Sequence, residues 1–425
     1  MTILPVSIKH KNTSLRDVIS HTSLLSCSEN YWFPFTANQT TNPWAANLAD
    51  TFTDTGAFTP KEAHNYSYGG AFSTEIGGLQ IITINTIIYS VKHKPAVPMG
   101  EDPFGQFAWL ESQLESAKAC GRPAWIVGHI PPGIETYGFT ELWKNEFVVK
   151  YLAVVQNEAL SPYIAAQLFG HVHACEFRLF PDPDALTGPI LLSGALSPVY
   201  YNNPAFRIIE YDSESFRPVG MAIYSATLSS GAEPLKWHLA LNITDTYESL
   251  RSAVSRDGFL SQTAYVDLAK DLSKGGTDWN TYSKWYKANY TNSLWNYGCD
   301  PLASTGTDAP DMAGIVQYIC ATNVAMTEDT LSACVSHTIP QLCSHVNDNA
   351  TENDDMIHDV GDDDDRTDIA ELTTGQIIAL VFGVISFIGV IGAAVYLQKN
   401  AHPRNSEAFS TELVDDVVTP LNAAS

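Results

Sequence analysis

Three histidines follow two short apolar runs, and their types and spacing could bind a metal ion. His129 belongs to VGHIPPG (127–133), whereas His171 and His173 belong to QLFGHVHACEFRLF (167–180). Neutral imidazole nitrogens are good ligands for zinc and other borderline metals. Because alternate residues of an extended segment point to the same side, both imidazoles of the second run can face one cleft. The sequence therefore predicts a zinc site suited to metal-assisted hydrolysis.

Both histidine runs are expected to stand where a buried strand ends. A rigid strand holds the loop that follows it, so polar side chains in such loops can reach into a cleft. In the first run, Gly128 lets the backbone turn, and Pro131 and Pro132 stiffen the exit. The two loops must then lie side by side for the three histidines to share a site.

Alternating apolar runs between residues 68 and 226 predict an α/β sandwich with packed sheets. The β-branched and aromatic runs predict strands over 78–90, 123–129, the first part of 165–173, 175–180, 188–194, 205–212 and 219–228. Apolar positions at helical spacing predict helices over 106–121 and within 147–164. Residues 246–345 also show helical periodicity and hold several cysteines.

The two Gly-His runs together resemble the C-terminal half of the calcineurin-like metallophosphoesterase signature, in particular that of the acid sphingomyelinase-like phosphodiesterases. Further matches are DPFGQFAWLESQL (102–114), Trp143, Asn145 and NNPAFRIIEYD (202–212), and the similarity covers roughly residues 30–345. The resemblance implies a partial metallophosphoesterase β-sandwich flanked by helices, followed by a helical, cysteine-containing subdomain. It also implies two-zinc hydrolysis of a phosphodiester such as sphingomyelin or a related phosphocholine substrate.

In such a family, His129 and His171 would bind one zinc and His173 the other. The remaining ligands would come from N-terminal D-x-H, G-D and G-N-H/D motifs, which the first 30 residues lack. Asn30 stands near the expected asparagine ligand but without its flanking residues, so the catalytic residue stays unknown. We expect an N-terminally truncated form of a longer enzyme, with an impaired site and inner strands that lack partners.

A segment near the C-terminus predicts a single membrane span. Residues 376–397 carry no charge over 22 positions, enough for a helix to cross about 30 Å of hydrocarbon. An acidic stretch precedes the segment, and Lys399 and Arg404 follow it, so the positive-inside rule places the tail in the cytosol. We expect a single-pass type I membrane protein whose ectodomain is extracellular or in the endosome or lysosome lumen. A signal peptide, which this topology calls for, is not recognisable at the start.

Sequons and cysteines agree with that compartment. Six N-x-S/T sequons precede the span, at Asn12, Asn38, Asn65, Asn242, Asn289 and Asn349. Four of the seven cysteines lie close together in the C-terminal part of the predicted ectodomain: Cys299, Cys320, Cys334 and Cys343. An oxidising lumen would let them pair, and the sequence leaves their connectivity open.

The predicted segments are a divergent N-terminal segment (1–30), a partial metallophosphoesterase domain (31–245), a helical subdomain (246–345), an acidic linker (346–375), a transmembrane helix (376–397) and a cytosolic tail (398–425). The formal net charge of −24 argues against a nucleic-acid partner and leaves a phospholipid or another phosphodiester as the substrate. Two other hypotheses stay open. The chain could be a non-catalytic, membrane-anchored glycoprotein, or a polyphosphate or nucleotide phosphoesterase of the same superfamily.

Overall fold

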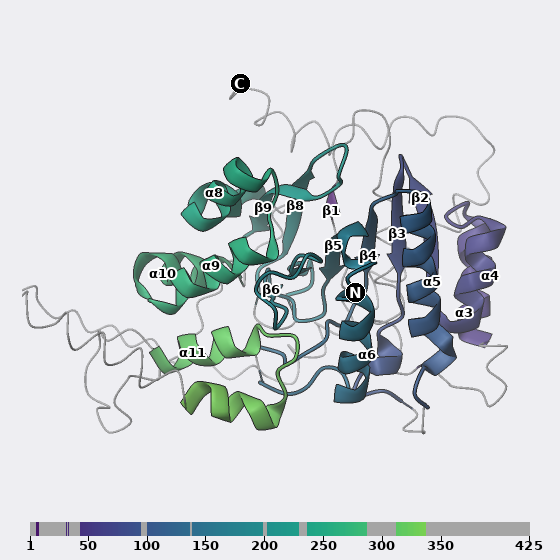
Figure 1. Ribbon diagram of the computed structural model, residues 1–425, viewed down its shortest axis with the longest axis horizontal. Helices are drawn as coiled ribbons and strands as arrows, with labels where there is room; N and C mark the ends of the chain where they lie inside the picture. The colour runs from purple at the N-terminus through teal and green to yellow at the C-terminus, as the bar shows by residue number, and fades with distance from the viewer. Residues whose placement is uncertain are drawn as a thin grey trace, which may run out of the picture. The chain divides into compact units, whose positions relative to one another are not determined.

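The computed structural model describes residues 6–7, 31, 33, 43–94, 100–136, 138–198, 202–228, 236–286 and 312–336. Their centre is a six-stranded sheet in the order β2-β3-β4-β5-β7-β6 (Figure 1). Its strands are β2 (Phe72–Ile76), β3 (Leu79–Thr83), β4 (Ala124–Val127), β5 (Ile164–Phe169), β6 (Phe177–Arg178) and β7 (Ile190–Leu192). Strands β3, β4, β5 and β7 run parallel, so their carboxyl ends meet at one edge. Strands β2 and β6 pair antiparallel at the two sides.

A second sheet packs against one face of the first. Its order is β1-β8-β9-β10, with β1 (Val6–Ser7), β8 (Ala205–Tyr211), β9 (Pro218–Ala226) and β10 (Trp237–Asn242). The core between the sheets holds Ile81 and Trp125 from the first sheet and Ile209 and Ile223 from the second. This two-sheet α/β arrangement confirms the predicted fold class at the level of architecture.

Helices cover the other face of the six-stranded sheet. Helix α5 (Gln106–Ala119) and helix α6 (Asn145–Val155) lie across it, with α3 (Pro43–Asp54) and α4 (Pro60–Gly69) beyond (Figure 1). Leu110 and Phe147 from these helices share a core with Ile82 and Ile126 of the sheet. Since β3, β4 and β5 are buried along their whole length, the sheet is a continuous apolar layer.

The predicted helical character after residue 246 is found in the described part. Helices α7 (Ile243–Thr246), α8 (Glu248–Asp257), α9 (Gln262–Ser273), α10 (Gly276–Tyr286) and α11 (Met312–Ala321) follow the second sheet. Residues 328–336 form a further helical stretch. A disulfide joins Cys320 at the end of α11 to Cys334 in that stretch.

Two sequence predictions need correction. The strand predicted over 78–90 ends at Thr83, and Ile87–Tyr89 form a 3-10 turn. The Asn85 side chain accepts a hydrogen bond from the Ile87 amide at 3.1 Å, which turns the backbone after the strand. The described inner strands also do not lack partners, because β2 pairs with β3 and β1 pairs with β8.

No described helix has the length and apolar composition needed to cross a bilayer. The predicted transmembrane segment 376–397, the linker before it and the tail after it lie outside the described residues.

Candidate metal centre

Adjacent parallel strands bring the first two histidines together. Strands β4 and β5 pair in parallel, with a constant register from Trp125 to Val127, and the Gly128 amide beyond β4 donates to the Leu168 carbonyl at 3.0 Å. The Gly170 amide beyond β5 then donates to the His129 carbonyl at 2.9 Å. The ladder therefore continues past both strand ends, and it fixes the two histidine loops side by side as predicted.

The imidazoles of His129 and His171 are separated by the distance that two ligands of one metal require. The Nε2 atom of His129 lies 3.3 Å from the Nδ1 atom of His171, and the rings are inclined by 76°. Two nitrogens at zinc–nitrogen bond lengths of about 2.0–2.1 Å in tetrahedral geometry lie about 3.3 Å apart. The same separation suits a long hydrogen bond between neutral imidazoles. The pair therefore fits a metal, and it can also exist without one.

The second histidine loop is not an extension of the strand. His171 has a φ of 72° and His173 a φ of 58°, so both adopt the left-handed conformation that side chains disfavour. The expectation that strand alternation aligns the imidazoles of His171 and His173 is therefore wrong, because this segment is not extended. A strained bend directs these residues instead, and such strain is commonly found at functional sites.

His173 lies near the pair but has its own surroundings. Burial lowers its pKa to about 4, and hydrogen bonds with the Asn202 side chain and the Ser197 backbone oppose that shift. Asn202 also donates to the Ser197 carbonyl at 3.0 Å, so it holds this loop as well. Asn202 is the first residue of the 202–212 segment that resembles the family, and its side chain contacts His173.

Burial also lowers the pKa values of the other two histidines. The His129 pKa is well below its ordinary value because the ring is desolvated and because His171 and His173 lie nearby. The His171 pKa falls to about 3 because its ring is desolvated and because His173 lies nearby, with a smaller effect from Lys92. All three imidazoles are consequently neutral at pH 7, which is the form that binds a metal.

Tyr31 is a contact of the site that the sequence reading missed. Its hydroxyl lies 3.2 Å from the Nε2 atom of His171, on the side of the ring away from His129. The Lys92 ammonium lies 5.9 Å from the centre of the Tyr31 ring. A partner on the second nitrogen of a ligating histidine orients the ring. Tyr31 directly follows Asn30, which stands near the asparagine position of the family motif and lies outside the described residues.

Three groups shape the loop around His129. The Trp143 indole donates to the Ile130 carbonyl at 2.9 Å, and the Thr86 hydroxyl accepts from the Ile130 amide at 2.8 Å. An added Cβ on Gly128 would lie 2.5 Å from the Phe169 ring, so close packing rather than a turn requires this glycine. Trp143 is one of the residues that carry the family resemblance, and its side chain is fully buried.

A buried carboxylate ties the two histidine loops together. Glu176 accepts hydrogen bonds from the Thr136 hydroxyl and from the Arg178 guanidinium, the latter at 2.8 Å. The side chains of Glu176 and Arg178 are both 0% exposed. Thr136 lies in the loop after His129, whereas Glu176 comes three residues after His173. A hydrogen-bonded network therefore fixes the two loops relative to each other.

The described residues contain no group of three or more His, Cys, Asp or Glu side chains placed to hold one metal ion. The structure thus brings His129 and His171 into contact and leaves His173 outside that pair. The Nδ1 atom of His129 is buried and has no hydrogen-bond partner among the described residues. Metal-ligating histidines usually donate a hydrogen bond from their second ring nitrogen. His171 has such a contact with Tyr31, and His129 has none among the described residues, so the pair fits a metal with one of its two rings oriented in this way.

The other predicted site residues are divided between described and undescribed regions. Asn65 lies in α4, and Asn242 caps α7 by accepting from the Asp245 amide at 3.2 Å. Cys320 and Cys334 are paired, one of the connectivities that the sequence left open. Outside the described residues lie Asn12, Asn38, Asn289, Asn349, Cys299 and Cys343.

Comparison with known proteins agrees with the two motifs. The chain is 32% identical over 280 residues to "Sphingomyelinase phosphodiesterase D" of Dictyostelium discoideum, covering 64% of this chain and 58% of that protein. It is 31% identical over 224 residues to the human "Acid sphingomyelinase-like phosphodiesterase 3b", covering 48% and 45%. It is 28% identical over 221 residues to the bovine "Sphingomyelin phosphodiesterase", covering 49% and 32%.

Two further comparisons add little. No family model matches the chain. A solved structure of a "Putative 5'-Nucleotidase from Staphylococcus aureus" has 13% identity and a TM-score of 0.19, over 44% of this chain and 33% of that one. The chain spans about half the length of the curated relatives it matches. By its sequence, the chain is a homologue of the sphingomyelin phosphodiesterases and the acid sphingomyelinase-like phosphodiesterases, as its two Gly-His runs predict.

Proposed function

We propose that this chain acts in the metal-dependent hydrolysis of a phosphodiester, with sphingomyelin or a related phosphocholine lipid as the substrate class. The observation that carries the proposal is the 3.3 Å separation between His129 Nε2 and His171 Nδ1 at adjacent strand ends. The similarity to phosphodiesterases supports the same chemistry. The names of those relatives suggest the substrate class.

The three histidines have separate roles in this proposal. His129 and His171 would hold one zinc, and His173 would hold a second. Bound zinc would lower the pKa of water and neutralise charge on the phosphoryl oxygens. The chain's own contribution is to keep three imidazoles neutral and fixed. Tyr31 orients the His171 ring, and the bonds from Trp143 and Thr86 hold the His129 loop.

The proposed location is a membrane surface facing the extracellular space or the lumen of an endosome or lysosome. Residues 376–397 would form the anchor, residues 398–425 the cytosolic tail, and the six sequons would carry glycans. The uncharged length of the segment and the basic residues after it support this topology. Resistance of the chain to alkaline carbonate extraction from membranes tests it, and release into the soluble fraction would contradict it.

The function is tested by hydrolysis of sphingomyelin and of bis(p-nitrophenyl) phosphate by the purified full chain with added zinc. His171→Ala should reduce the rate by at least about 100-fold, whereas His238→Ala, at an exposed position on β10, should leave it unchanged. Equal rates for wild type and His171→Ala would refute the assignment. Hydrolysis of nucleotides or polyphosphate in place of both diesters would support the other phosphoesterase hypothesis. Zinc binding without any hydrolysis would support the non-catalytic one.

A further inference from the structure

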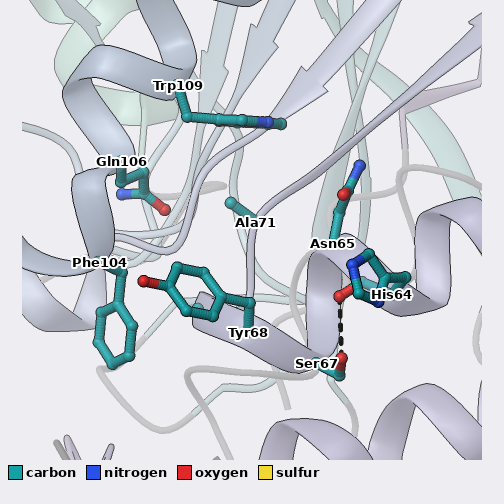
Figure 2. Close-up of a pocket in the computed structure, with 9 residues that line it drawn as sticks. His64, Asn65, Ser67, Tyr68, Ala71, Phe104, Gln106 and Trp109 are labelled. Atoms are coloured by element: carbon teal, nitrogen blue, oxygen red, sulfur yellow. Dashed lines mark hydrogen bonds between the residues drawn. The ribbon is translucent and has the colours of Figure 1, made fainter. Parts of the chain in front are cut away.

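A pocket separate from the candidate metal centre lies between helices α4 and α5. Its volume is about 280 Å³, and its walls include Asn65, Tyr68 and Trp109. Figure 2 shows Trp109 on one side, Tyr68 on another, the Ala71 methyl group between them and the Asn65 amide opposite. None of the three histidines of the metal centre lines this pocket.

Helical spacing explains why these side chains meet. Asn65 and Tyr68 are three residues apart on α4, and Gln106 and Trp109 are three apart on α5, so each helix presents a pair on one face. Tyr66 fixes the rotation of α4, since it is 1% exposed and packs against Phe58 and Phe72. The polar atoms of Gln106 are already hydrogen-bonded to Asn85 and Tyr89, so Gln106 forms a wall and is not needed as a ligand group.

The chemistry of the lining selects among small ligands. The described residues that line the pocket include no Asp, Glu, Lys or Arg, and the one imidazole among them belongs to His64. The lining therefore favours a ligand without a full charge. It combines the aromatic side chains of Tyr68, Phe104 and Trp109 with polar groups that include the Asn65 amide and the Ser67 hydroxyl. The volume falls below the roughly 300–1,000 Å³ typical of pockets for larger ligands, which limits the occupant to about one ring. A neutral ring with one apolar face and polar edges meets all three conditions.

We propose that this pocket binds a pyranose ring, whose C–H face packs against Trp109 and Tyr68. Tyr68 is 39% exposed, which is unusual among the aromatic side chains of the described residues, and a bound sugar would cover it. Asn65, Tyr66 and Ser67 form an N-x-S sequon, so the Asn65 side chain that lines the pocket is also a possible attachment point for a glycan. The ring can therefore come from the first sugar of a glycan on Asn65 or from a separate saccharide. This inference is independent of the proposed hydrolysis.

The first arm of the test examines the chain's own glycan. The full chain is secreted from a eukaryotic host, and mass spectrometry of the peptide that contains Asn65 reports its occupancy. Trimming the glycans to single N-acetylglucosamine residues should preserve Tm, whereas Asn65→Gln should lower Tm by about 2–4 °C. The decrease should be smaller in a Trp109→Ala background, because the sugar then loses one of its two aromatic partners. Asn242→Gln is the matched sequon control, and its effect should be the same in both backgrounds.

The second arm examines a separate saccharide. In the Asn65→Gln chain, free N-acetylglucosamine and methyl glucoside should receive saturation from the protein in ligand-observed NMR. That signal should fall at least fivefold in Trp109→Ala and in Tyr68→Ala, whereas Trp237→Ala on β10 should leave it unchanged. Tyr68→Ala keeps the test decisive if Trp109→Ala fails to fold. The proposal is overturned if Asn65 and Trp109 are not coupled in Tm and neither saccharide receives saturation that depends on Trp109 or Tyr68.

Discussion

The Nδ1 atom of His171 lies 3.3 Å from the Nε2 atom of His129, although 42 positions separate the two residues in the chain. Their contact follows from the parallel pairing of β4 with β5 and from two further backbone hydrogen bonds beyond the strand ends. The site is therefore a property of the sheet edge, where ligands commonly bind in α/β proteins.

Acid should destabilise the metal-free chain through the buried histidines. Each has a folded pKa below the unfolded value near 6.5, reaching about 3 for His171 and about 4 for His173. Below pH 6.5 the unfolded chain binds protons that the folded chain does not, so stability is full above that pH and falls as pH decreases. The loss amounts to up to about 1.4 kcal/mol per pH unit for each histidine.

Urea denaturation of the chelator-treated chain at pH 7 and pH 5 measures this loss. His171→Asn should reduce the pH dependence by the share of this one histidine, because an amide does not titrate, while His238→Asn should keep the wild-type slope. An unchanged slope in His171→Asn would show that His171 takes up no additional proton when the chain unfolds.

Glu176→Gln should strongly destabilise the protein. The substitution leaves the Arg178 charge buried without a carboxylate, and breaking a buried ion pair in this way costs about 3–5 kcal/mol. Thr136→Val removes one hydrogen bond to Glu176 and should cost about 1–3 kcal/mol. The free energy of unfolding from denaturant titration measures both effects.

The matched control is Glu75→Gln. Glu75 forms an ion pair with Arg122 at 2.6 Å, but its side chain is 54% exposed, so the loss should be less than about 1 kcal/mol. Equal losses for Glu176→Gln and Glu75→Gln would mean that burial does not strengthen the Glu176 network.

Removing the disulfide should destabilise the region around α11. The bond between Cys320 and Cys334 closes a loop over 14 positions, for which the chain-entropy model gives about 3 kcal/mol. The double substitution to serine should lower the free energy of unfolding by about that amount. Cys120→Ser, at an exposed free cysteine, should have no effect. Peptide mapping without reduction that links Cys320 to another cysteine would contradict the pairing.

The sequence predicted those elements whose patterns are purely local. The helix over 106–121 and the strand at 123–129 are found as α5 and β4, since helical spacing and β-branched runs are sufficient signals there. The strand at 78–90 was predicted too long, because its apolar residues continue into a buried 3-10 turn that the Asn85 side chain sets. Strands β2 and β10 were not predicted, and both owe their place to pairing with a neighbouring strand.

The sequence predicted that His129 and His171 lie together, and it predicted the local backbone geometry less well. Glycine and histidine at two strand ends identified His129 and His171, which the structure places in contact. The left-handed backbone at His171 and His173 has no signal in residue type, because such a conformation in a non-glycine residue is imposed by the surrounding fold. The contact with Tyr31 could not be predicted either, since it joins residues 140 positions apart.

Zinc binding to the purified full chain tests the central claim most directly. The metal content after dialysis should be at least one zinc per chain. The His129→Ala and His171→Ala variants should each lose that zinc while keeping a folded circular dichroism spectrum, and His238→Ala should retain it. Undiminished zinc in both His129→Ala and His171→Ala would show that this pair does not bind the metal and would contradict the account.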